Sequence, residues 1–164
     1  MELINTNTEE VKGLLLNLSA KAKGYYDLQW EVLKKEAVLI HGYRGFHFEL
    51  AGIAGITRKY LVAYSTFHMV KESYWGRGLG KVMTDDILQW AKNKHIPCVI
   101  LQYHHNNLGI VKTLKKSGIQ HDMKLGELSY YIKATTRWAI PLKYFMLVLV
   151  LIHYMVCIKR IKQC

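Results

Sequence analysis

Cysteine and proline are scarce in this chain of 164 residues, which contains three cysteines and two prolines. The cysteines, Cys98, Cys157 and Cys164, are odd in number and widely spaced, and no CxxC pair occurs, so neither a disulfide framework nor a zinc site is expected. The opening residues, MELINTNTEE, are polar and give no sign of a signal peptide, so we expect a cytoplasmic domain. With 51% apolar residues, the composition excludes disorder and low complexity.

Acidic residues are absent from residues 133–164, which carry six of the lysines and arginines. Residues 1–132 carry the other 17 together with all 12 acids, and the formal charge of the chain is +11. This excess favours an anionic partner, such as a phosphate-rich cofactor or lipid head groups, although a generally basic surface is the alternative. No arginine-rich helix or recognition motif is present, so nucleic acid is not expected as a partner.

Hydrophobic periodicity predicts a mixed α/β domain over residues 1–133, with a central mixed sheet flanked by helices. Segment 55–59 reads as a turn. The strand–loop–helix–strand order at the centre implies a parallel strand pair joined by a crossover helix. The expected elements are strands at 1–6, 37–43, 46–53, 59–70 and 98–104, helices at 7–24, 26–35, 79–93 and 106–118, and two short strands within 119–133.

Three glycines, Gly76, Gly78 and Gly80, lie between a strand ending near Val70 and an amphipathic helix. The first N–H groups of a helix are unpaired and partly positive, so this loop can form an anion cradle suited to a pyrophosphate, with Arg77 at its rim. A flexible turn closed by a helix is the alternative.

Two other phosphate-binding loops do not fit this stretch. A Walker A loop needs Lys-Ser/Thr after its last glycine, whereas Lys81 is followed by Val82. The dinucleotide fingerprint GxGxxG is absent as well, because the spacing here is GxGxG.

The segment VKESYWGRGLGKVMTDDILQWAKNKHI, residues 70–96, resembles the acetyl-CoA-binding segment of the GNAT family of N-acetyltransferases. NNLGIVKTLKKSGI, residues 106–119, is similar to the segment that follows it in that fold, and the resemblance extends over about residues 59–133. The family loop reads Gln/Arg-x-x-Gly-x-Gly/Ala. Gly78 and Gly80 match its two glycines, whereas Trp75 replaces the Gln/Arg.

The resemblance implies the GNAT acyl-CoA N-acyltransferase fold and acetyl-CoA as co-substrate. Backbone N–H groups from Arg77 to Gly80 would bind the pyrophosphate, and the strand from His68 to Val70 would pair with the pantetheine arm. Asn107 matches an asparagine that often contacts the cofactor, although a simple helix cap explains it equally well. The positions expected at the cofactor are His68, Met69, Val70, Trp75, Gly76, Arg77, Gly78, Leu79, Gly80, Lys81 and Asn107.

The same resemblance implies direct acyl transfer, in which a base takes the amine proton and an acid protonates the leaving thiolate. The usual tyrosine for the second task is replaced by Leu114, so Tyr103, His104 and His105, at the end of the preceding strand, are the substitutes that we consider, with Tyr103 preferred. Glu49 and His68 are the candidate bases, although a surface Glu49 and a hydrogen-bonded core His68 are the plainer interpretations. No HxH or HxxxH occurs among the eight histidines, so no metal is expected.

Residues 134–164 form a separate hydrophobic tail with basic flanks in this interpretation. Its core, 144–158, has only His153 as a polar interruption, and we expect lipid contact through residues 138–160. The tail either spans a membrane or lies on its surface, and packing against the domain or a partner chain is the alternative.

Together these features predict an N-acetyltransferase that moves an acetyl group from acetyl-CoA to a primary amine of a small molecule or protein. The alternative is a non-catalytic acyl-CoA-binding module tethered to a membrane or partner. The acceptor and the oligomeric state leave no signal in the sequence.

Overall fold

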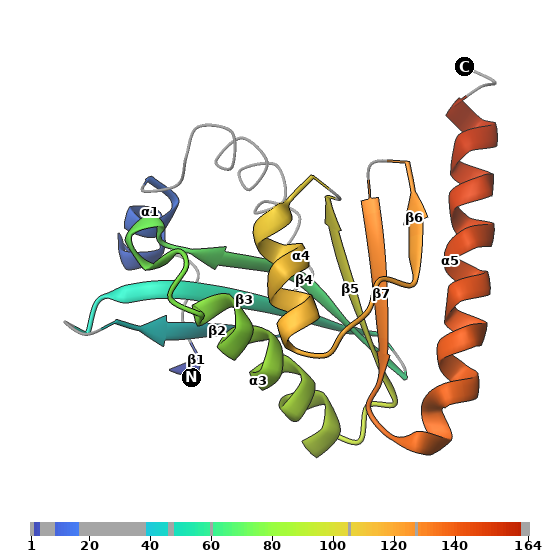
Figure 1. The fold of residues 1–164 in the computed structure, drawn as a ribbon, viewed down its shortest axis with the longest axis horizontal. Coiled ribbons are helices and arrows are strands. Elements are labelled where there is room, and N and C mark those ends of the chain that lie inside the picture. The colour runs from blue at the N-terminus through green and yellow to red at the C-terminus, as the bar shows by residue number, and fades with distance from the viewer. Residues whose placement is uncertain are drawn as a thin grey trace.

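A seven-stranded sheet runs through the computed structural model, which describes residues 2–3, 9–16, 39–45, 48–59, 61–104, 106–126 and 128–161 (Figure 1). The strands are β1 (Glu2–Leu3), β2 (Leu39–Arg44), β3 (Leu50–Lys59), β4 (Val62–Val70), β5 (Cys98–His104), β6 (Met123–Leu125) and β7 (Leu128–Ala134). The helices are α1 (Glu9–Leu16), α3 (Leu79–Asn93), α4 (Leu108–Lys116) and α5 (Ile140–Ile161), with short 3-10 turns η1 (Glu72–Tyr74) and η2 (Arg137–Ala139).

The strand order is β1-β2-β3-β4-β5-β7-β6, and β4 and β5 pair in parallel while the other neighbours are antiparallel. Helix α3 makes the crossover between the two parallel strands, as the sequence predicts. The mixed α/β fold with a central mixed sheet flanked by helices is therefore confirmed.

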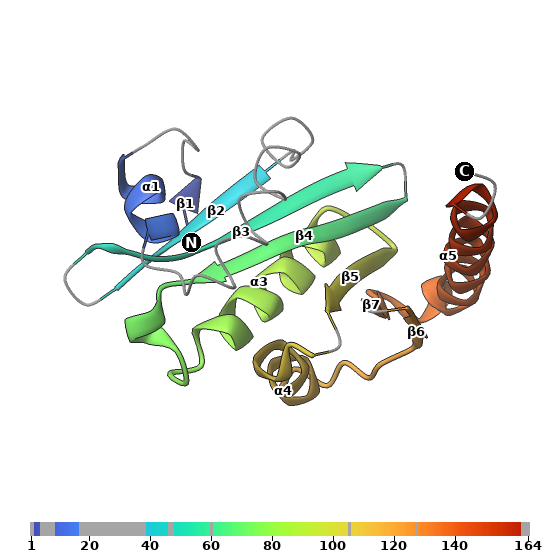
Figure 2. The same cartoon turned by 90° about the horizontal axis from the view of Figure 1, so that it is seen from above.

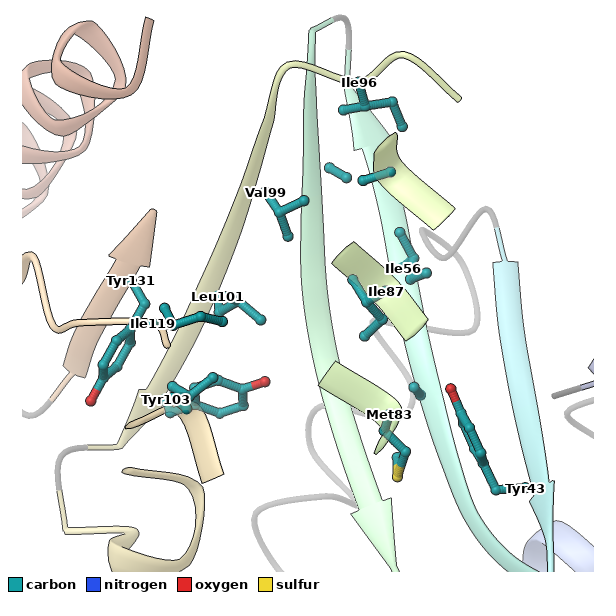
Figure 3. Close-up of a cluster of buried hydrophobic side chains, with 14 residues drawn as sticks. Tyr43, Ile56, Met83, Ile87, Ile96, Val99, Leu101, Tyr103, Ile119 and Tyr131 are labelled. Atoms are coloured by element: carbon teal, nitrogen blue, oxygen red, sulfur yellow. The ribbon is translucent and has the colours of Figure 1, made fainter. Parts of the chain in front are cut away.

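Helices α3 and α4 cover one face of the sheet, and α1 lies over the other, as the view from above shows (Figure 2). The main core fills the space between the sheet and α3 and α4 (Figure 3), where Met83 and Ile87 of α3 belong to the same buried cluster as Val99 and Leu101 of β5. Helix α3 has the limits that the sequence predicts, Leu79 to Asn93. Its buried residues Met83, Ile87 and Ala91 follow at every fourth position and therefore lie on the same side of the helix.

The turn predicted at residues 55–59 is wrong, because β3 continues through this segment to Lys59. Earlier in β3, at Gly52, glycine permits close strand approach, because a Cβ there would lie 2.8 Å from the backbone oxygen of Met69 on β4. Helix α1 begins at Glu9, and the expected second helix at 26–35 lies outside the described residues.

Helix α5 packs against the face of the sheet opposite α3 and α4. Met146 is buried with Ile100 and Ile132, whose side chains alternate along their strands with those of the main core. Within the part of the chain that the structure describes, we find no helix with the length and apolar content that a bilayer crossing requires. The prediction that the tail spans a membrane is therefore wrong for these residues. One side of α5 packs against the sheet, and its Lys143 forms an ion pair with Asp122.

Candidate functional site

The loop after β4 turns sharply through two glycines in the left-handed region. Gly76 has φ +76° and Gly78 has φ +87°, and Gly78 is the N-cap residue of α3. A Cβ on either residue would meet no atom within 4 Å, so the requirement for glycine is conformational and does not come from crowding within the protein.

The first turn of α3 contains backbone donors that have no backbone acceptor among the described residues. The backbone N–H groups of Lys81 and Val82 both donate to the oxygen of Gly78, at 2.9 and 3.2 Å. Among the described residues, the N–H groups of Gly78, Leu79 and Gly80 donate to no backbone oxygen. Three neighbouring donors at the positive end of a helix are an arrangement suited to an anion.

Trp75 stands at the position where the family pattern carries Gln or Arg, and the structure shows its contact. Its indole Nε1 donates to the backbone oxygen of Val70 at 2.8 Å, so the loop is tied to the last residue of β4. The guanidinium of Arg77 lies 5.4 Å from the ring centre of Tyr74, within cation–π range. Lys81, by contrast, forms an ion pair with Asp85 one turn along α3.

A bulge in β4 precedes this loop. Gly55 of β3 pairs with Phe67, whereas the next residue of β3, Ile56, pairs with Ser65. Strand β4 therefore contains one extra residue, Thr66, which shifts the alternation of its side chains between the two faces.

The bulge explains why Ser65 and His68, three residues apart, are both buried and in contact. In a regular strand, residues with that separation point to opposite faces. The parallel pairing of β4 with β5 also ends here, since Ser65 and Leu101 are the last paired residues. Beyond this pair the two strands separate, at the place where the resemblance predicts the pantetheine arm.

His68 and Tyr103 meet across the separated strands. The Tyr103 hydroxyl lies 3.0 Å from His68 Nδ1, and the Ser65 hydroxyl lies 3.3 Å from His68 Nε2. Burial lowers the pKa of His68 to about 4, so the ring is neutral near pH 7. This geometry is that of a hydrogen-bonded core histidine.

Glu49 lies on the other side of the loop, just before β3. It accepts a hydrogen bond from the Tyr74 hydroxyl, and this contact leaves no room for a side chain at Gly45, where a Cβ would lie 2.0 Å from the Tyr74 oxygen. Glu49 and Lys71 line a hollow of about 170 Å³ beside α1. Sequence spacing gives no signal for the Tyr74 contact, because the two residues are 25 positions apart.

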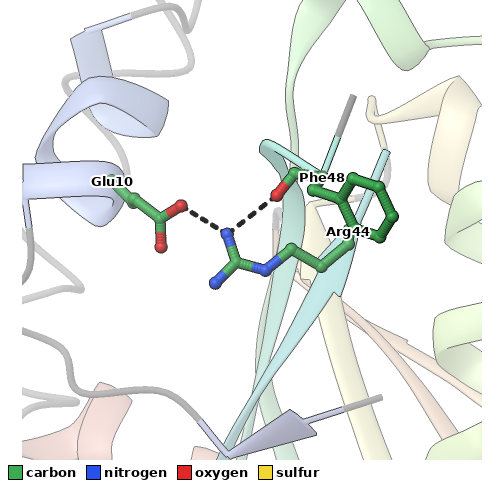
Figure 4. Close-up of polar contacts among 3 residues, drawn as sticks. All are labelled: Glu10, Arg44 and Phe48. Carbon is green, nitrogen blue, oxygen red and sulfur yellow. Dashed lines mark hydrogen bonds and ion pairs between the residues drawn. The ribbon is translucent and has the colours of Figure 1, made fainter. Parts of the chain in front are cut away.

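Arg44 fixes the edge of this hollow by joining α1 to the turn between β2 and β3. Its guanidinium forms an ion pair with Glu10 and donates to the backbone oxygen of Phe48 at 3.0 Å (Figure 4). Since Glu10 also lines the hollow, the ion pair holds one wall in place.

The remaining predicted residues lie around α4. Asn107 is the N-cap of that helix, and its side chain accepts from the backbone N–H of Ile110 at 3.2 Å. Leu114, which replaces the usual tyrosine, is fully buried in the main core. No cluster of three or more potential metal ligands occurs among the residues that the structure describes.

The family model described as the acetyltransferase (GNAT) family matches residues 16–119, more than half of the chain. No curated protein matches the chain significantly.

Several solved structures are similar to this chain at low sequence identity. A GNAT-family acetyltransferase from Staphylococcus aureus shares 15% identity with a TM-score of 0.65, over 83% of this chain and 98% of that one. A predicted streptothricin acetyltransferase from Bacillus anthracis, solved in complex with acetyl coenzyme A, shares 19% identity with a TM-score of 0.55, over 63% and 68%. The ribosomal-protein-S18-alanine N-acetyltransferase of Escherichia coli shares 10% identity with a TM-score of 0.57, over 80% and 88%. These likenesses concern the fold, and the family model identifies the chemistry: the chain belongs to the GNAT acetyltransferase family of acetyl-CoA-dependent N-acyltransferases.

Proposed function

We propose that this protein transfers the acetyl group of acetyl-CoA to a primary amine of a small molecule or protein, in the cytoplasm, and that residues 1–133 carry the reaction. The observation that carries the proposal is the row of donors at Gly78, Leu79 and Gly80, which follows a strand that has separated from its parallel neighbour. A long anionic thioester needs both features, one for its phosphates and one for its extended arm.

In this proposal the pyrophosphate accepts from the three N–H groups, and Arg77 adds charge at the rim. The pantetheine arm lies along β4 from His68 to Val70. The Val70 oxygen already accepts from Trp75, so the arm depends on the other backbone groups of that segment.

The chemical step is attack of the neutral amine nitrogen on the thioester carbon, followed by cleavage of the carbon–sulfur bond. We assign proton removal from the amine to Glu49, directly or through water, because it is half-buried and lines the hollow beside α1. We assign protonation of the leaving thiolate to Tyr103, whose hydroxyl is hydrogen-bonded to His68. Leu114 is buried and apolar and has no proton to give.

The donor site is tested by acetyl-CoA titration calorimetry on Gly78→Val. Valine strains the left-handed conformation at residue 78, so we expect acetyl-CoA to bind at least about tenfold more weakly, the equivalent of one lost hydrogen bond to a charged group. Gly118→Val is the matched control, because Gly118 also has a positive φ and open space around its Cα, at the far end of α4. Equal affinity in both variants and the wild type would show that the loop is only a turn.

Turnover is tested separately by measuring release of free CoA against a broad panel of amines. We expect Glu49→Gln to lower kcat while leaving acetyl-CoA affinity unchanged. Tight binding of acetyl-CoA without turnover of any amine would instead indicate the non-catalytic binding module.

A further inference from the structure

Helix α5 uses one of its sides to attach to the domain. Met146 is buried there, with Leu142 and Leu147 packed around it, and Lys143 forms an ion pair with Asp122. In Figures 1 and 2 the helix stands at one end of the sheet, beside β7 and β6.

The outward side of α5 is apolar along its described length. Tyr144 and Phe145 are 62% and 57% exposed, and no charged residue occurs in the sequence between Lys143 and Lys159. The exposed apolar residues of this side, which we call the α5 outer face, are Ile140, Tyr144, Phe145, Val148, Leu149, Leu151, Ile152 and Met155.

These residues form one continuous surface. Ile140, Tyr144, Val148, Leu151 and Met155 follow at spacings of four, four, three and four, which places them in one stripe along the helix. The other members adjoin this stripe. Soluble monomers rarely expose so large a contiguous apolar patch without a binding role.

Charge decides which partner fits the α5 outer face. Exposed Arg137 precedes the helix, Lys159 and Arg160 lie in its last turn, and residues 133–164 contain no acid. A second copy docked through the same face would bring cations near cations with no carboxylate from either tail to pair them. A surface of anionic lipid head groups complements both the basic ends and the apolar middle.

We propose that the α5 outer face docks on the surface of an anionic lipid bilayer, with the helix axis in the plane of the interface. The aromatic residues Trp138, Tyr144 and Phe145, all exposed near the start of the helix, are suited to the headgroup level. Met146 and the Lys143–Asp122 ion pair hold α5 against the sheet, so binding of α5 to the bilayer also attaches the domain to it.

This docking is independent of the proposed function. The glycine loop and α5 lie at opposite ends of the sheet in both views, so a docked helix leaves the cofactor loop open (Figures 1 and 2). Lipid binding is therefore measured without acetyl-CoA, and its failure would leave the acetyl transfer untouched.

The test is co-sedimentation of the full chain with vesicles of phosphatidylcholine and phosphatidylglycerol at 1:1, and with vesicles of phosphatidylcholine alone. We expect binding to the first and little to the second. The double substitution Phe145→Glu and Val148→Glu should lower partitioning at least about tenfold, since it places two charges on the outer face. Phe48→Glu is the matched control, because Phe48 is 81% exposed but lies in the turn before β3.

Arg137→Gln tests the charge argument without altering the apolar face, and should weaken partitioning about fivefold, as one cation near an anionic surface contributes. Light scattering on the same protein samples measures whether the chain forms a dimer. Three results would each overturn the proposal. The first is equal binding to both vesicle types, and the second is unchanged binding of the double variant. The third is a stable dimer that the double substitution disrupts, together with no binding to vesicles.

Discussion

Burial keeps the His68 ring uncharged near pH 7, so the stability of the fold depends on the protonation of this residue. The ring is surrounded by the separated ends of β4 and β5 and has hydroxyl neighbours on both nitrogens. Two hydroxyls satisfy a neutral imidazole, which has one donor and one acceptor, but they compensate the desolvation of a cation poorly.

The first prediction concerns pH. The pKa of His68 is about 4 in the folded protein and near 6.5 when unfolded, so the unfolded chain binds more protons in this window. The contribution of His68 to the free energy of unfolding is fully present above pH 6.5. It is lost as the pH decreases toward 4, and the loss is about 3 kcal/mol at most. Urea unfolding at several pH values measures the loss.

His68→Gln separates this effect from the titration of carboxylates, which both proteins share. We expect the variant to be less stable at pH 7 but to lose less stability between pH 6.5 and 4. Parallel pH curves for the two proteins would contradict the prediction.

The second prediction concerns Tyr103. Tyr103→Phe removes the proposed proton donor and the hydroxyl that contacts His68 Nδ1, so we expect kcat to fall about 10²-fold. The free energy of unfolding should fall by about 0.5–1.5 kcal/mol, the net contribution of one hydrogen bond. The KM for acetyl-CoA should change little, which distinguishes lost chemistry from lost binding.

Tyr64→Phe is the control for this measurement. Tyr64 lies on β4 but faces the cluster under α5, on the opposite side of the sheet from Tyr103. Equal losses of kcat in the two variants would assign the effect of Tyr103→Phe to packing.

At the scale of the elements, the turn between β2 and β3 is built around the missing side chain of Gly45. Its N–H donates to the backbone oxygen of Glu49 at 2.8 Å, and the end of the Tyr74 side chain fills the space where a Cβ would lie. The turn, η1 and the start of β3 are therefore packed as one unit.

The third prediction follows from this packing. Gly45→Ala must displace Tyr74 from Glu49, so we expect a loss of about 2 kcal/mol in thermal or urea unfolding, typical of overpacking. Gly13→Ala, in α1, has no atom within 4 Å of the new Cβ and should gain up to about 1 kcal/mol from helix propensity. If Gly45→Ala had the same free energy of unfolding as the wild type, η1 would shift without an energetic cost, and the prediction would be wrong.

Local patterns predicted the elements whose contacts repeat regularly along the chain. The periodic apolar residues of α3 and the compact run of β5 gave their correct limits, and Asn107 was recognisable as a cap. The same reasoning failed at residues 55–59, because Gly55 lies within the paired part of β3 and does not make a turn.

The arrangement of the site was harder to foresee for a physical reason. The bulge at Thr66 shifts the strand alternation by one residue, and no local pattern reveals it. The contacts of His68 with Tyr103 and of Glu49 with Tyr74 join residues far apart in sequence, so they exist only once the sheet has formed.

At the scale of the whole molecule, the net charge of +11 acts on any anionic ligand before contact. Acetyl-CoA carries several phosphate charges, so the field accelerates its approach. The tail with α5 and the first 132 residues both contribute cations to this field.

The fourth prediction is that added salt slows acetyl-CoA association far more than it speeds dissociation. Between about 0.05 and 0.5 M salt, screening should lower the association rate constant on the order of tenfold, as stopped-flow measurement can check. S-acetylpantetheine lacks the phosphates and should show little dependence, so an equal salt effect on both ligands would contradict the prediction.

The hydrogen bond from Trp75 to Val70 gives the protein a built-in optical probe. Its indole is 48% exposed and anchored beside the loop that we assign to the pyrophosphate, so its emission depends on both local solvent and the position of that loop. The difference between the fluorescence of the wild type and of Trp75→Phe isolates this one signal from the other three tryptophans. Events at the loop can thus be followed in real time without attaching any dye.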